Sequence, residues 1–170
     1  AQVRRIAIML FEQLNDVHGV SGSWRIVLEV AALLHDVGEV VHRRGHNKHG
    51  EYLIRNGRIP RLTDDTRKMV AALVRGHRKS LPCKRHLTYG ELTTEQKHLV
   101  ERIAPIVRLA DALDTDHRQR VHSVQAHVDP KGKRVTLRVM VASPSDDVHP
   151  PHLVERKLEA FKEVYGYDVG

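Results

Sequence analysis

The chain has 170 residues, 41% of them hydrophobic and 29% charged, a composition that excludes intrinsic disorder and allows one domain with a buried core. No stretch approaches 18 consecutive apolar residues, so the sequence predicts no membrane span. The single cysteine, Cys83, excludes an internal disulfide, and we expect a cytoplasmic protein. The 28 Lys and Arg exceed the 21 Asp and Glu, and the net charge of +7 favours an anionic partner.

The N-terminal third predicts helices. An amphipathic pattern over 3–15 predicts the first, and because the pattern begins at the first residues we expect a piece of a longer protein. Ser21 and Ser23 are N-cap candidates for a helix over 24–37, which is apolar on most sides and should lie centrally in a bundle. A short helix over 51–54 is expected next.

The middle of the chain predicts a longer helix. Thr63 or Asp64 should cap it, and its apolar positions continue to His77. A loop over 80–90 should follow.

One more helix precedes a change of pattern. Thr93 or Thr94 should cap it, and its apolar face continues past Asp111. Pro105 should kink or restart this helix, because proline has no backbone N–H to donate.

From Val121 onward the hydrophobic residues follow a period of two. They flank a strong hairpin turn at 129–133, and an amphipathic helix is expected over 151–165. The predicted fold class is therefore mainly α, with a helical bundle over 1–118. A small C-terminal β-hairpin plus helix, over 119–170, should pack on that bundle.

The stretch AALLHDVG places His35 and Asp36 at the end of a long apolar run. An unpaired carboxylate is costly to bury, and a metal ion would compensate it, since imidazole nitrogen and carboxylate oxygen both bind first-row ions. The alternative is a helix end that reaches water, with Asp36 solvated.

Polar residues interrupt the apolar faces of at least four predicted helical segments. They are His35, Asp36, His49, His77 and Asp111. Helix bundles build metal sites from side chains that converge in this way. Three imidazoles and two carboxylates suit one or two divalent ions of manganese (Mn), iron (Fe), magnesium (Mg) or zinc (Zn), and the histidines argue against calcium.

Six segments, in order along the chain, resemble the C-terminal HD domain of the exopolyphosphatase / guanosine pentaphosphate phosphatase family, part of the HD superfamily of metal-dependent phosphohydrolases. They are LFEQLNDVHGV, AALLHDVGEVV, GHNKHGEYLIRNGRIP, MVAALVRGHRKS, IVRLADALDTDHRQRV and LVERKLEAFKEVYG. The resemblance covers nearly the whole chain and implies an HD-domain helical bundle.

The resemblance also implies roles for the five clustered residues. His35 and Asp36 match the HD pair, His49 and His77 match the intermediate histidines of dinuclear sites, and Asp111 matches the terminal aspartate. Catalytic roles are implied for Asp36, which would bind or bridge the metal, and for Asp111, which would complete the shell or orient the attacking water.

Two ligand positions differ from a simple match. His46 lies three residues before His49 and can share its helical face, so spacing leaves both open, while the motif favours His49. The superfamily's first histidine stands a few residues before the position of Val3, which falls before Ala1. The expected ligand shell is therefore incomplete.

Basic residues flank the expected ligands in sequence. Lys48, Arg75, Arg78 and Lys79 would bind phosphate oxygens as charge partners. The alternative for each of them is a solvated, charged surface.

Two functions follow. The first is metal-dependent hydrolysis of a phosphoester or phosphoanhydride in polyphosphate or a phosphorylated nucleotide. The second is a non-catalytic module that binds the same polyanions and forms a homodimer, because the resemblance attributes phosphatase activity to an N-terminal actin-like domain outside this sequence. Nucleic-acid binding is the weakest alternative, because only 4% of the residues are aromatic.

Overall fold

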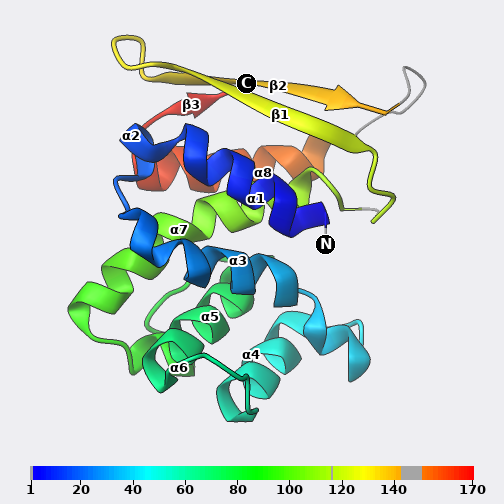
Figure 1. Cartoon of the computed structure of the whole chain (residues 1–170), viewed down its shortest axis with the longest axis vertical. Coiled ribbons are helices and arrows are strands. Elements are labelled where there is room, and N and C mark those ends of the chain that lie inside the picture. The colour runs from blue at the N-terminus through cyan, green and yellow to red at the C-terminus, as the bar shows by residue number, and fades with distance from the viewer. Residues whose placement is uncertain (1, 116, 143–150) are drawn as a thin grey trace.

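The computed structural model describes residues 2–115, 117–142 and 151–170. Its helices form an elongated body, and a small sheet closes one end (Figure 1). The elements in chain order are α1 (Gln2–Gln13), α2 (Asn15–His18), η1 (Gly22–Trp24), α3 (Arg25–Leu34), η2 (Val37–Val40), α4 (His46–Asn56), α5 (Asp64–Gly76), α6 (Leu87–Gly90), α7 (Thr94–Ala112), β1 (Val121–Asp129), β2 (Arg134–Val141), α8 (Pro151–Tyr165) and β3 (Asp168–Val169). The predicted mainly α fold with a small hairpin is confirmed. None of the described helices is long and apolar enough to cross a membrane.

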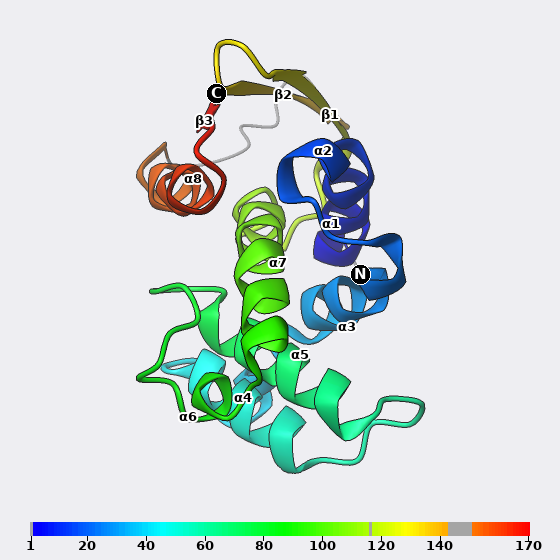
Figure 2. The same cartoon turned by 90° about the vertical axis from the view of Figure 1, so that its left-hand side faces the viewer.

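Helix α7 is the centre of the body. It packs against α1, α3, α5 and α8, and both views show it between the sheet end and the α4–α5 end (Figures 1 and 2). Thr93 caps it in a capping box, in which the Thr93 and Gln96 side chains each accept the other's backbone N–H. The predicted cap is therefore present.

Pro105 does not interrupt α7. The helix continues from Thr94 to Ala112, so the expected restart is wrong. The side chain of Pro105 is buried, and in the preceding turn the carbonyl of Arg102 accepts a hydrogen bond from the Tyr165 hydroxyl of α8. This contact joins the turn before Pro105 to α8, although the carbonyl that loses its intrahelical donor is that of Glu101.

The sheet contains the predicted hairpin and one further strand. Oδ1 of Asp129 accepts the backbone N–H groups of Lys131 and Gly132, both at 3.1 Å, which closes the turn between β1 and β2. β3 pairs with β2 in parallel, and its two residues are too few to show an alternating pattern in sequence. β1 packs on α1 and β3 on α8, so the sheet spans these two helices (Figure 2).

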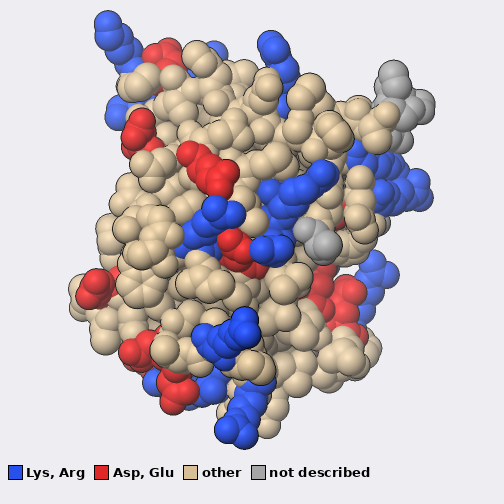
Figure 3. All heavy atoms as spheres, in the orientation of Figure 1, with Lys and Arg blue, Asp and Glu red and all other residues tan. Residues whose placement is uncertain are grey.

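Ion pairs join α1 to α3. Arg25 contacts Glu12 at 2.7 Å and Glu29 at 2.8 Å, and Arg4 also contacts Glu29. In Figure 3, cations and carboxylates are interspersed on the face in view, and the described residues of that face form no continuous basic stripe. This face therefore gives no support to nucleic-acid binding.

His18 is a buried, neutral histidine at the end of α2. Its Nδ1 accepts the N–H of Val20 at 2.9 Å, and its Nε2 lies 2.8 Å from the carbonyl oxygen of Phe11, so Nε2 carries the proton. Burial lowers the pKa of His18, and the charge of Arg102 lowers it further, against the hydrogen bond to Phe11.

The buried His18 predicts that the folded protein loses stability in acid. The folded protein protonates His18 less readily than the unfolded chain does. The contribution of neutral His18 to the stability of the fold is therefore complete above the unfolded pKa of about 6.5, and it decreases as the pH falls below that value. The slope from one group is at most about 1.4 kcal/mol per pH unit. Urea unfolding at about pH 7.5 and about pH 5.5 should show a larger loss in the wild type than in His18→Gln. Equal losses in the two proteins would contradict the assignment.

Candidate metal centre

Two of the predicted metal ligands lie in the turn after α3. α3 ends just before His35, and Asp36 precedes η2. Gly38 of η2 lies directly against the backbone of His46 and Gly50, so η2 packs on α4 with no side chain between them. This close approach brings His46, the first residue of α4, to Asp36.

Asp36, His46 and His77 form the tightest cluster. Oδ1 of Asp36 lies 3.1 Å from Nε2 of His46 and 3.6 Å from Nε2 of His77. The two Nε2 atoms are 3.1 Å apart, and both rings are buried. Metal–ligand distances of about 2.0–2.2 Å place neighbouring ligand atoms about 3–3.6 Å apart, so this spacing is that of three ligands to one ion.

The other nitrogen of each ring determines what faces Asp36. Nδ1 of His46 lies 3.1 Å from the carbonyl oxygen of Arg43, and Nδ1 of His77 lies 2.6 Å from that of Val74. A carbonyl oxygen only accepts, so each Nδ1 can donate to its carbonyl, although Nη1 of Arg78 also lies 3.4 Å from Nδ1 of His46. In the neutral tautomer with Nδ1 protonated, each Nε2 offers a lone pair to a metal ion. In that tautomer the two lone pairs and the carboxylate meet at one point, and either a proton shared between the two Nε2 atoms or a cation must lie there. The arrangement therefore fits a metal ion, with the carbonyls as the outer partners that orient the imidazoles.

His35 contacts the second oxygen of Asp36. Its Nε2 lies 3.0 Å from Oδ2 of Asp36 and 3.6 Å from Oδ1 of Asp111. Its Nδ1 lies 2.9 Å from the carbonyl oxygen of Ala32. Nε2 of His35 is buried and has no hydrogen-bond partner among the described residues. A ring nitrogen left without a partner between two carboxylates is a further position that a cation fits.

Burial and mutual charge shift the pKa values of the cluster. Burial alone would raise the pKa of Asp36, but the adjacent imidazoles of His35 and His77 hold it far below its ordinary range. Burial opposes protonation of His35, but Asp36 and Asp111 outweigh it and raise the His35 pKa. Burial lowers the pKa of His46, which favours the neutral ring that a metal requires.

A lysine of α8 pairs with Asp111. Lys157 donates a hydrogen bond to Oδ2 of Asp111, and both residues are buried. Burial would raise the pKa of Asp111, but the charges of Lys157, His77 and His35 lower it overall. Asp111 therefore carries its negative charge inside the protein, with Oδ1 facing His35.

The structure brings four of the five predicted ligands together and places His46 where His49 was expected. The four are His35, Asp36, His77 and Asp111. His49 is half-buried and its ring is directed back toward Gly45, where an added Cβ would lie 3.9 Å from Nε2. The difference arises because α4 begins at His46, directly after the left-handed Gly45 (φ 80°), and not at Glu51 as the sequence predicts.

Two further residues reach the centre without having been predicted. Nε2 of His117, in the segment after α7, lies 3.2 Å from Oδ2 of Asp36, and Lys157 contacts Asp111. His117 lies outside any helical period, and Lys157 is one of many lysines on an amphipathic pattern. The sequence therefore carries no signal that would have singled out either residue.

A cavity of about 360 Å³ opens at the cluster. Arg43, Arg78 and Lys79 line it, so two of the four predicted phosphate-binding cations are in place. Arg75 instead pairs with Glu51 at 3.2 Å. Lys48 is exposed and is not among the described residues that line the cavity.

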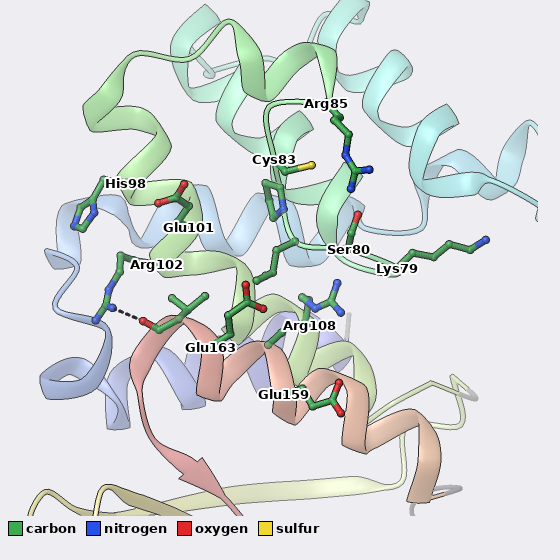
Figure 4. A pocket seen from close by; sticks show the side chains of 14 residues that line it. Lys79, Ser80, Cys83, Arg85, His98, Glu101, Arg102, Arg108, Glu159 and Glu163 are labelled. Atoms are coloured by element: carbon green, nitrogen blue, oxygen red, sulfur yellow. Dashed lines mark hydrogen bonds between the residues drawn. The ribbon is translucent and has the colours of Figure 1, made fainter.

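A larger cavity, of about 750 Å³, lies between residues 79–85, α7 and α8 (Figure 4). Glu163 and Arg108 project into this space, and the guanidinium of Arg108 donates to the carbonyl of Gly76 at 2.8 Å. Its cations and carboxylates are spread around the wall (Figure 4), whereas the three-donor cluster found in the described part of the chain lies in the smaller cavity. The smaller cavity is therefore the candidate functional site.

Fold and site together define a mainly α-helical domain that gathers histidines and carboxylates from α4, α5, α7 and the turn after α3 at one buried position. The family model of the Ppx/GppA phosphatases, domain III, matches residues 1–160. The chain belongs to this family.

Curated relatives agree with this assignment. The chain is 29% identical over 114 residues to a guanosine-5'-triphosphate,3'-diphosphate pyrophosphatase of Pseudoalteromonas atlantica, a match that covers 64% of this chain and 21% of the relative. A protein of the same description from Aeromonas hydrophila is 30% identical over 110 residues, covering 64% of this chain and 22% of the relative. The chain thus spans about a fifth of the length of these relatives.

Proposed function

We propose that this domain holds a divalent metal ion at Asp36, His46 and His77 and uses it to hydrolyse a phosphoanhydride or phosphoester of polyphosphate or a guanosine nucleotide. The observation that carries the proposal is the pair of Nε2 atoms of His46 and His77, 3.1 Å apart, that face the half-buried carboxylate of Asp36. Manganese, iron, zinc and magnesium are the candidate ions. His35 and Asp111 lie next to this site, where Lys157 already contacts Asp111.

The residues around the cluster have distinct tasks in this proposal. A bound divalent ion would supply a Lewis acid and a water of lowered pKa. Arg78 and Lys79 bind the anionic phosphate oxygens at the cavity wall. Oδ1 of Asp111, which faces His35 and is not contacted by Lys157, would accept a hydrogen bond from the attacking water and orient it toward phosphorus.

The second candidate is a non-catalytic module that binds polyphosphate or a nucleotide and dimerises. The contact between Lys157 and Asp111 favours it, because this carboxylate would otherwise complete a ligand shell. In this case hydrolysis belongs to an N-terminal actin-like domain of a longer parent protein, of which this chain is one part.

Phosphate release separates the two candidates. The purified chain is incubated with Mn²⁺ and polyphosphate, guanosine pentaphosphate or guanosine tetraphosphate. If the wild type releases phosphate and the Asp36→Asn variant does not, the result supports hydrolysis by this domain. Binding of a polyanion without release supports the binding module. Absence of Mn²⁺ binding overturns hydrolysis at this centre, and absence of polyanion binding overturns the module.

The choice between His46 and His49 makes a separate prediction. Loss of a residue that hydrogen-bonds a metal ligand weakens metal affinity about 10–100-fold. His46→Ala removes a ligand itself, so we expect it to raise the Kd for Mn²⁺ by about 100-fold or more. His49→Ala, on the same helix, should leave the Kd nearly unchanged. Isothermal titration calorimetry measures both values. A larger loss in His49→Ala than in His46→Ala would show that the family-matched histidine is the ligand.

A further inference from the structure

Lys157 is a buried cation at the place where a second metal ion would bind. Its residue exposure is 8%, equal to that of Asp111, and its ammonium contacts Oδ2 of the Asp111 carboxylate. A lysine is rarely buried unless its charge is paired, so this contact is the reason that the side chain is held inside.

The ligands divide into two groups around Asp36. Oδ1 of Asp36 faces His46 and His77, and no lysine or arginine of the described residues pairs with that oxygen. Oδ2 of Asp36 faces His35, which in turn faces Asp111. On this second side the protein already supplies a positive charge, from Lys157.

Charge balance then differs between the two sides. A divalent ion at the first side meets one carboxylate and two neutral imidazoles. A divalent ion at the second side would share Asp111 with an ammonium group a few ångströms away, and like charges at such a distance in a buried site repel strongly.

We propose that the ammonium of Lys157 takes the place of a second metal ion and restricts this centre to a single divalent ion, bound at Asp36, His46 and His77. The inference rests on the proposed metal centre and sets its stoichiometry. Lys157 acts here as a positioning residue, because it fixes Asp111 through Oδ2 and leaves Oδ1 toward His35.

The stoichiometry of Mn²⁺ binding tests this role without any measurement of activity. We expect one ion per chain in the wild type and two in Lys157→Met, which keeps the apolar stem and removes the charge. The double variant Lys157→Met/Asp111→Asn should return to one ion, because the carboxylate that binds the second is gone. Lys162→Met is the matched control on α8, since Lys162 is exposed and pairs with Asp168 at 2.6 Å, and it should bind one ion.

Electron paramagnetic resonance of the wild type, saturated with Mn²⁺ and then separated from the unbound ion, gives a second measurement that needs no variant. An isolated six-line spectrum supports the proposal, and a spin-coupled pair overturns it. Two ions in the wild type, or one ion in folded Lys157→Met, also overturn it. No bound ion in the wild type overturns the metal centre itself, which distinguishes that failure from a failure of the lysine's role.

Discussion

Asp36→Asn is expected to abolish the stabilisation of this domain by Mn²⁺. Both oxygens of Asp36 contact histidines, and Oδ1 is the carboxylate atom of the three-donor cluster. At an Mn²⁺ concentration 100 times its Kd, binding stabilises the wild type by about 2.7 kcal/mol. For a chain of this size that raises the melting temperature by about 5–10 °C. Asp36→Asn should show no rise, because a neutral amide oxygen replaces the anionic ligand.

Thermal melts with and without Mn²⁺ measure this effect, and Asp65→Asn is the control. Asp65 is exposed in the first turn of α5, so its loss removes the same charge far from the metal ligands. It should retain the full Mn²⁺-dependent rise. An equal rise in Asp36→Asn would remove Asp36 from the ligand set.

Gly38→Ala is expected to be the most damaging single-methyl change in the domain. The added Cβ would overlap the carbonyl oxygen of His46 and lie 2.5 Å from the amide nitrogen of Gly50. Both obstacles are backbone atoms, so α4 itself must move away from η2. Overpacking costs about 1–3 kcal/mol, and we expect a loss of about 3 kcal/mol, with a fall in the melting temperature of about 6–12 °C. The same displacement carries His46 away from Asp36 and should weaken Mn²⁺ binding by at least about tenfold.

Gly22→Ala is the control for Gly38→Ala. A Cβ at Gly22 meets no atom within 4 Å, so this variant should stay within about 0.5 kcal/mol of the wild type. Urea unfolding measures both. A loss below about 1 kcal/mol in Gly38→Ala would show that η2 and α4 are not packed as closely as described.

The periodic elements were predictable because burial imposes their pattern. The hairpin and α8 have clear periods of two and 3.6, and the caps at Thr63 and Thr93 use the side-chain oxygen that a first helical turn requires. The apolar run before His35 likewise indicated a buried end of α3. These features depend on neighbours in sequence.

The details of the centre depend on contacts between distant segments. The choice of His46 over His49 follows from where α4 begins, and that start depends on the packing of η2 against α4 through Gly38. Lys157 meets Asp111 across 46 positions in the chain. No local pattern contains this information.

Crystals of the wild type soaked in Mn²⁺ and measured by anomalous diffraction test the metal centre most directly. We expect one anomalous peak per chain, within about 2.0–2.3 Å of Oδ1 of Asp36 and of Nε2 of His46 and His77. A cluster that stays free of anomalous density at saturating Mn²⁺, or an ion bound through His49 and not His46, would contradict the account.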